Sequence, residues 1–359
     1  MHDVIRVLVV DDTVTYRKIM SQVVEALDGT ELVGTAANGA LALEKIPVLK
    51  PDLVLMDIVM PQMDGLTALR EIRVRHPDLA VVMVSSHSRE DADVTMQALA
   101  AGAFDFIPKP AGQDMDANLG WLLAKVRPIL HLVRTRRYTA AARGAGGGTR
   151  EAAAPAPART TDAALRPGLV AIGVSTGGPR VLNEIFRALT PDLPVPVLLV
   201  QHMPPIFTAS LAEHISAGTG FPMREGAHGE PVLPGRAYIA PGGRHMEVRC
   251  GRDRSLTVEI NDRDPVYSCR PAVDVLLRSL AVHGPEQVLA VVLTGMGRDG
   301  TDGLTALKAA RRCHCLIQDE ATSVVFGMPK AVQEAGLADE VLPGALIGAR
   351  INALVRGAC

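Results

Sequence analysis

The sequence predicts an α/β protein built from two doubly wound, mainly parallel sheets with a linker between them. Short apolar runs alternate with amphipathic stretches on both sides of the middle of the chain, which is typical of βα units. The intervening segment is nearly free of large apolar residues. The chain has 359 residues, 48% apolar and 21% charged, which is enough to bury two cores.

Composition and charge exclude several classes of protein. The net charge is −2, whereas a general nucleic-acid binder needs an excess of basic residues to bind phosphates. No apolar run reaches the roughly 18 residues needed to span a bilayer, and the start "MHDVIRVLVVDD" does not resemble a signal peptide. "CHC" at 313–315 lacks a second ligand pair for zinc. We therefore expect a cytoplasmic protein with reduced cysteines and no metal in its second half, neither an integral membrane protein nor a nucleic-acid partner.

Five apolar runs in the first half predict the strands of the first sheet. They cover 7–10, 32–37, 53–56, 81–84 and 105–108. Helical periodicity between them is clearest over 16–27 and 65–74. Such units form a parallel sheet with helices on both faces, and ligands bind beyond the carboxyl ends of its strands.

Polar residues stand at those carboxyl ends. Asp11 and Asp12 end the first strand and Asp57 the third, while Ser85 and Lys109 follow the fourth and fifth. Any one of them could be a solvated loop residue, but together they place three carboxylates, a hydroxyl and an ammonium at one edge. Hard oxygen ligands suit Mg²⁺, and an aspartate beside that metal can become an aspartyl phosphate.

The runs "VVDD", "LVLMDIVMPQMDG", "VVMVSSHS" and "GAFDFIPKP" make residues 4–132 similar to a response-regulator receiver domain. The resemblance implies a flavodoxin-like (βα)₅ sheet and a histidine kinase as phosphodonor. It also implies Mg²⁺ in this domain and a cis Lys109–Pro110 bond. By the same resemblance, the phospho-acceptor is Asp57, the metal ligands are Asp11, Asp12, Asp57 and the Val59 carbonyl, and the phosphoryl-sensing and switch residues are Ser85, Lys109 and Phe106.

Residues 139–167 read "TAAARGAGGGTREAAAPAPARTTDAALRP". Such a segment buries too little apolar surface to offset its ordering entropy, so we expect a flexible linker. The predicted division is therefore a receiver domain at 1–138, the linker at 139–167 and a catalytic domain at 168–359.

The motif "GVSTGGP" follows an apolar run at 169–172. It lacks the lysine of a Walker A loop and the spacing of a dinucleotide-binding fingerprint. It does match GxSxG, in which a sharp turn presents a serine, here Ser175, although a plain glycine-rich βα turn explains it about as well.

A base and an acid for Ser175 follow two later strand patterns. His202 ends the run at 195–200, and Asp299 lies in the glycine-rich turn after 288–293. Each has an ordinary alternative, a histidine in a loop and an aspartate capping a helix. The order serine, histidine, aspartate is not that of α/β-hydrolases. His245 and His228 are rival bases in turn-rich regions, and Arg270 could touch a substrate or start a helix.

The second half resembles the catalytic domain of the CheB family of chemotaxis protein-glutamate methylesterases. The matching runs include "GVSTGGP", "QHMPPIFTASLAEHI", "LTGMGRDGTDGL" and "QDEATSVVFGMPKAVQEAG". The resemblance implies a nucleophile at Ser175, a general base at His202 and its orienting acid at Asp299. It assigns the oxyanion hole to the backbone at Thr176 and Met296, without a cofactor in this domain.

That resemblance also implies the function. The substrates would be glutamate γ-methyl esters and particular glutamines of methyl-accepting chemoreceptors, and phosphorylation of Asp57 would relieve a restriction that the receiver places on the site. Val59 and Cys269 depart from the usual family pattern and leave open which paralogue this is. The alternative is a related signalling scaffold outside chemotaxis; a transcriptional regulator is disfavoured because the second half has no helix-turn-helix pattern.

Overall fold

The computed structural model describes residues 4–110, 115–145 and 165–357. The chain divides into two compact units, Met1–Ala152 and Ala153–Cys359. Among the described residues, no helix is both long enough and apolar enough to cross a membrane.

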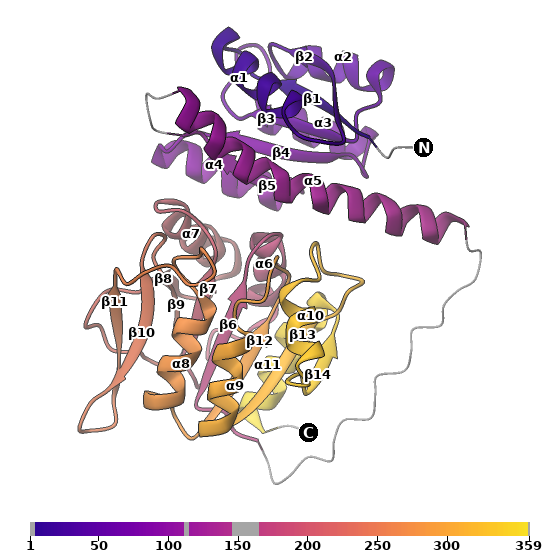
Figure 1. The fold of residues 1–359 in the computed structure, drawn as a ribbon. Helices are drawn as coiled ribbons and strands as arrows, with labels where there is room; N and C mark the ends of the chain where they lie inside the picture. The colour runs from indigo at the N-terminus through magenta and orange to yellow at the C-terminus, as the bar shows by residue number, and fades with distance from the viewer. Residues whose placement is uncertain (1–3, 111–114, 146–164, 358–359) are drawn as a thin grey trace. The chain divides into compact units, whose positions relative to one another are not determined.

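The first unit is a five-stranded parallel sheet in the order β2-β1-β3-β4-β5 (Figure 1). Its strands are β1 Ile5–Val10, β2 Thr30–Ala36, β3 Leu53–Asp57, β4 Ala80–Ser85 and β5 Asp105–Pro108. Its helices are α1 Val14–Glu25, α2 Gly39–Leu49, α3 Gly65–Arg75, α4 Arg89–Ala100 and α5 Met115–Ala145. The doubly wound sheet predicted for this half is confirmed.

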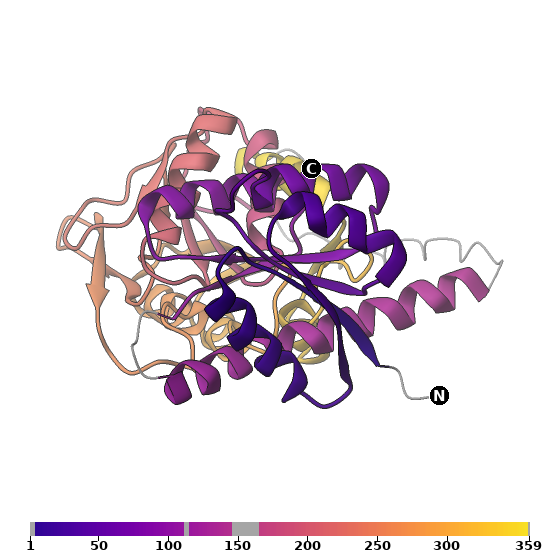
Figure 2. The same cartoon turned by 90° about the horizontal axis from the view of Figure 1, so that it is seen from above.

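Helices cover both faces of this sheet. Helices α1 and α5 contact each other on one face, and α2, α3 and α4 follow one another on the other (Figure 2). Strands β3 and β4 lie inside the sheet and are therefore buried along their whole length, which is why they read as continuous apolar runs rather than alternating ones.

Helix α5 continues beyond the predicted domain end at residue 138 to Ala145. Its last turns read "TAAARGA", and alanine and arginine are strong helix formers, so local propensity extends the helix into the segment read as linker. Residues 146–164 of that segment lie outside the described part of the chain.

The second unit contains a seven-stranded parallel sheet in the order β14-β13-β12-β6-β7-β9-β8, with an antiparallel β10-β11 hairpin beside it (Figure 1). The strands are β6 Leu169–Val174, β7 Val197–Gln201, β8 Met223–Glu225, β9 Ala237–Ile239, β10 His245–Cys250, β11 Leu256–Asn261, β12 Gln287–Val292, β13 Arg312–Gln318 and β14 Glu340–Leu342. The helices are α6 Gly178–Ala188, α7 Phe207–Thr219, α8 Val273–His283, α9 Thr301–Ala310, α10 Met328–Glu334 and α11 Gly344–Arg356.

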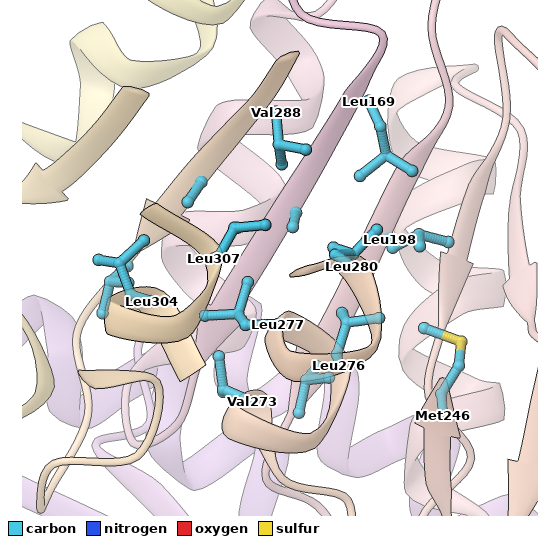
Figure 3. Close-up of a cluster of buried hydrophobic side chains, with 14 of the residues drawn as sticks. Leu169, Leu198, Met246, Val273, Leu276, Leu277, Leu280, Val288, Leu304 and Leu307 are labelled. Carbon is cyan, nitrogen blue, oxygen red and sulfur yellow. The ribbon is translucent and has the colours of Figure 1, made fainter. Parts of the chain in front are cut away.

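A buried apolar cluster joins this sheet to α8 and α9. Figure 3 shows Leu169 and Val288 of the sheet facing Leu277 and Leu280 of α8, with Leu307 of α9 alongside. All five side chains are at most 2% exposed, and burial of each such side chain stabilises the fold by about 1.5–3 kcal/mol. This cluster fixes the positions of the amino ends of α8 and α9 above the sheet.

Both sheets reverse their winding direction next to their first strand. The first sheet reverses between β1 and β3, and the second between β6 and β12. Loops that leave the carboxyl ends of such a strand pair diverge and open a crevice, which is where α/β sheets bind ligands. In the first sheet, Asp11 follows β1 and Asp57 ends β3. In the second sheet, Ser175 lies in the loop after β6 and Asp299 in the loop after β12.

Candidate functional site

Three carboxylates meet at the winding reversal of the first sheet. One oxygen each from Asp11, Asp12 and Asp57 lies within 4.8 Å of the others. Lys109 Nζ donates to Asp57 at 2.8 Å and to Asp11 at 3.0 Å. Asp11 and Asp57 are buried, while Asp12 is exposed, so the cluster opens to solvent on one side.

The electrostatics of this cluster favour binding of a cation. The pKa of Asp57 is raised to about 6 in all: burial raises it most, the Lys109 hydrogen bond and charge lower it, and the Asp11 charge raises it. One ammonium therefore does not offset the carboxylates fully. Closely spaced carboxylate oxygens are the donor set that Mg²⁺ prefers, so the residues fit this metal. Val59 lies two residues beyond Asp57 in the adjoining loop, with its side chain 61% exposed.

The other predicted receiver residues lie on neighbouring strands. Ser85 ends β4, and its buried hydroxyl is hydrogen-bonded to Thr95 Oγ1 at 2.8 Å, not to Asp57. Phe106 is paired with Met83 in the β4–β5 register and packs against the core. The Lys109–Pro110 bond was expected to be cis and is trans: the cis bond recorded in the described residues is Arg270–Pro271. The trans form is the ordinary preference of an X–Pro bond.

Sequence reasoning missed Tyr16. Lys109 Nζ lies 4.4 Å from the centre of its ring. Its hydroxyl is buried, and the described residues offer it no hydrogen-bond partner. Burial first, and then the charges of Asp11 and Asp57, raise the pKa of Tyr16. The only signal in the sequence was its place four residues after Asp12, one helical turn on.

In the second unit, Ser175 lies in the tight turn between β6 and α6. Gly177 has φ +79°, a left-handed conformation that glycine adopts without steric cost. A Cβ on Gly178 would stand 1.9 Å from Gln201 Oε1. The glycines of "GVSTGGP" are therefore required by backbone conformation and by close packing around the serine.

His202 lies beside Ser175 on the adjacent strand end. Val174 pairs with Gln201 across β6 and β7, and the His202 N–H donates to the Val174 carbonyl at 3.1 Å. Gln201 Nε2 donates to the Ser175 carbonyl at 2.9 Å, so the two loops are tied together directly. Sequence reasoning missed Gln201. Its one signal was that a polar residue ends an otherwise apolar, buried strand.

Asp299 is hydrogen-bonded to His202. His202 Nε2 lies 2.8 Å from Asp299 Oδ2, and the two side chains are 12% and 2% exposed. The carboxylate also accepts the N–H groups of Val273 at 2.7 Å and Asp274 at 2.9 Å. Because an ionised carboxylate only accepts, Nε2 carries a proton, and Nδ1 is the ring nitrogen left to act as a base.

Asp274 completes a reciprocal arrangement that the sequence did not suggest. Its Oδ1 accepts the N–H groups of Gly300 at 2.9 Å and Gly303 at 2.7 Å, at the start of α9. Asp299, next to α9, in turn accepts the first N–H groups of α8. Asp274 in α8 thus satisfies free amide donors at the start of α9, and Asp299 in the loop before α9 satisfies those at the start of α8. The pair holds Asp299 at a defined position over the sheet.

The second ring nitrogen of His202 faces a cysteine. Cys269 Sγ lies 3.7 Å from Nδ1, whereas the described residues show no hydrogen bond between the Ser175 hydroxyl and the ring. Burial lowers the pKa of His202, but hydrogen bonds to Asp299 and Cys269, together with their charges, raise it to about 9. In the sequence Cys269 stood out only as a departure from the family pattern.

Two backbone donors flank Ser175. The loop at 294–296 packs against it: the Ser175 N–H donates to Thr294 O at 3.0 Å, and Thr294 Oγ1 donates to Thr176 O at 2.9 Å. A Cβ on Gly295 would lie 2.8 Å from Ser175 Cβ. Among the hydrogen bonds of the described residues, the N–H groups of Thr176 and Met296 have no protein acceptor. Both remain available to an oxygen anion.

The rival residues are engaged elsewhere. His245 is fully buried, with Nε2 against the Asp264 carbonyl at 3.1 Å. His228 Nδ1 accepts the Ile260 N–H at 3.2 Å, and Arg270 donates to the carbonyls of residues 262 and 263. The structure therefore brings His202, rather than either other histidine, to the end of the strand beside Ser175.

Comparison with known proteins places both halves of the chain. The CheB methylesterase family profile matches residues 170–351, and that of the response regulator receiver domain matches residues 7–117. A protein-glutamate methylesterase/protein-glutamine glutaminase of Desulfotalea psychrophila is 40% identical over 347 residues, covering 94% of this chain and 95% of its own. The equally named protein of Geobacillus kaustophilus is 41% identical, covering 98% and 99%.

A solved structure agrees with these relatives. The CheB methylesterase catalytic domain of Thermotoga maritima is 41% identical, and its superposition covers 53% of this chain and 99% of that domain with a TM-score of 0.51. Together with the family match over half of the sequence, these similarities show that the chain belongs to the CheB methylesterase family.

Proposed function

We propose that this protein is a phosphorylation-regulated serine hydrolase that removes methyl groups from glutamate γ-methyl esters of chemoreceptors and deamidates particular receptor glutamines. Its role would be adaptation in chemotaxis. The observation that carries the proposal is the hydrogen bond between His202 and Asp299. His202 follows the strand β7, which is paired with the strand that leads to Ser175. The names of the full-length relatives support the same substrate class.

The His202–Asp299 hydrogen bond and the position of Ser175 on the neighbouring strand end support the following chemistry. Nδ1 of His202 accepts the proton as the Ser175 hydroxyl attacks the ester carbonyl, and Asp299 holds the imidazolium through Nε2. The N–H groups of Thr176 and Met296 donate to the developing oxyanion. Methanol leaves with the proton from His202, and water then cleaves the acyl-enzyme by the same steps. With a glutamine side chain, ammonia leaves instead of methanol.

The receiver would control this activity. Asp57 accepts a phosphoryl group from a histidine kinase, and Asp11, Asp12, Asp57 and the Val59 carbonyl would hold Mg²⁺. The metal supplies positive charge against the carboxylates and the phosphoryl oxygens. Lys109 and Ser85 would then bind those oxygens, with Phe106 as the switch side chain. Allosteric couplings of about 1–3 kcal/mol correspond to roughly 5–150-fold activation.

The proposed division keeps the receiver at 1–138, the linker at 139–167 and the esterase at 168–359. The four cysteines of the described residues form no disulfide, which suits the reducing conditions of the cytoplasm. We place the protein there.

Methanol release from methylated receptor membranes tests the function. Ser175→Ala should lower kcat on the order of 10⁶-fold, whereas Ser255→Ala, an exposed serine of the β10–β11 hairpin, should leave it unchanged. Equal methanol release by the wild type and Ser175→Ala would show that Ser175 is not the nucleophile. No release by any form would favour a signalling scaffold.

A further inference from the structure

The imidazole of His202 is held at both ring nitrogens. Asp299 Oδ2 is hydrogen-bonded to Nε2 at 2.8 Å, and Cys269 Sγ lies 3.7 Å from Nδ1. These partners come from different loops, Asp299 from between β12 and α9 and Cys269 from the segment before α8. The nitrogen that must accept the Ser175 proton is therefore already occupied.

The loop that carries Cys269 is shaped to present the thiol. Tyr267 and Ser268 have φ +50° and +61°, a left-handed conformation that costs non-glycine residues free energy. Val266 and Cys269 exchange two backbone hydrogen bonds, at 2.9 and 3.1 Å, which close the turn. The Tyr267 hydroxyl also donates to Asp302 at 2.6 Å and ties the turn to α9. Such a turn persists only where its surroundings hold it.

The hydrogen bond between Cys269 Sγ and His202 Nδ1 requires one proton, carried by either atom. Since Nε2 donates to Asp299, Nδ1 either accepts from a thiol or donates to a thiolate. The ring faces the Asp299 carboxylate on its other side, and an anion there favours the imidazolium form. The charges that act on the ring are those of Asp299 and Cys269, and the Asp299 charge also raises the pKa of Asp274. The raised pKa of His202 agrees with the ion pair.

We propose that Cys269 is a positioning residue of the esterase, whose thiolate pairs with Nδ1 of His202 at rest and must be exchanged for the Ser175 hydroxyl before the reaction begins. This rests on the proposed role of His202 as the base. Around neutral pH the pair keeps most of the enzyme in the imidazolium form. Cys269 therefore restrains the activity that Ser175, His202 and Asp299 carry out.

The other cysteines of the described chain lack this arrangement. Cys313 and Cys315 lie on β13, where burial raises the pKa of both thiols. Cys250 is exposed at the end of β10, and its recorded contact is with the Gly251 carbonyl. Cys250 is therefore a suitable control position.

The test replaces Cys269 in the full-length protein. In Cys269→Ala, the acid limb of the pH profile of methanol release should move to lower pH, and the rate at pH 7 should rise about tenfold for every pH unit that the limb moves. Cys269→Ser should move the limb the same way, because a serine hydroxyl does not become an anion in this range. Cys250→Ala should keep the wild-type profile. The proposal would be overturned if the acid limb of both Cys269 variants stayed at the wild-type pH or moved to higher pH.

A second measurement does not need turnover. The NMR titration of the His202 ring, recorded with Ser175→Ala as the parent, should show a lower midpoint after Cys269→Ala. If Ser175→Ala retained methanol release, the proposed serine mechanism would fail, while this titration would still decide whether Cys269 pairs with His202. A midpoint that stays in place excludes the pair.

Discussion

Replacement of Asp299 by asparagine tests how the site orients its base. All three groups that point at the carboxylate are donors: His202 Nε2–H and the N–H groups of Val273 and Asp274. An asparagine brings an NH₂ group, so at least one donor must face a donor, at a cost of about 1–3 kcal/mol. If the amide nitrogen turns toward His202, Nε2 becomes the acceptor and Nδ1 carries the proton. The base is then lost.

We therefore expect Asp299→Asn to lower kcat on the order of 10⁴-fold, which corresponds to about 5.4 kcal/mol of transition-state stabilisation. Loss of the carboxylate should also move the acid limb of the pH profile to lower pH, because Asp299 raises the pKa of His202. The assay is methanol release from methylated receptor membranes over a range of pH. Asp192→Asn, an exposed residue paired with Arg356, is the control. A loss below tenfold with an unmoved acid limb would refute the orienting role.

Four further outcomes are expected. Methanol release by the wild type should rise with pH, reach half of its maximum near pH 9 and level off above that, because His202 acts as a base only when neutral and its pKa is about 9; a plateau already reached at pH 7 would contradict this. The His202 contribution to stability should be complete below its unfolded pKa of about 6.5 and lost as pH rises through 9, which urea unfolding at several pH values can measure. Acetyl phosphate with Mg²⁺ should raise the rate of methanol release, and Asp57→Asn or EDTA should each abolish the increase, whereas Asp52→Asn should not. Asp274→Ala should lower the free energy of unfolding by about 1–3 kcal/mol or more, since the buried N–H groups of Gly300 and Gly303 lose their acceptor; a value near zero in urea unfolding would show that the reciprocal capping is unimportant.

Several elements were predictable because parallel sheets obey simple geometry. The β3 strand was expected at 53–56 and spans Leu53–Asp57, and β12 was expected at 288–293 and spans Gln287–Val292. Errors of one residue do not change the edge of the sheet at which the following loop begins. Asp57 and Asp299 could therefore be assigned to the ligand-binding edge without coordinates.

The sequence by itself determined the first sheet, three adjacent strands of the second sheet (β12, β6 and β7), and which polar residues follow their carboxyl ends. The reason is that buried strands need apolar runs and parallel strands end at a common edge. Only the tertiary structure decided which side chains of the irregular segments join them. Cys269 reaches His202 through a turn in an unusual backbone conformation, and Asp274 meets the start of α9 through the packing of two helices. Neither contact follows from periodicity or spacing, because each depends on where loops and helix ends from distant parts of the chain come to rest against one core.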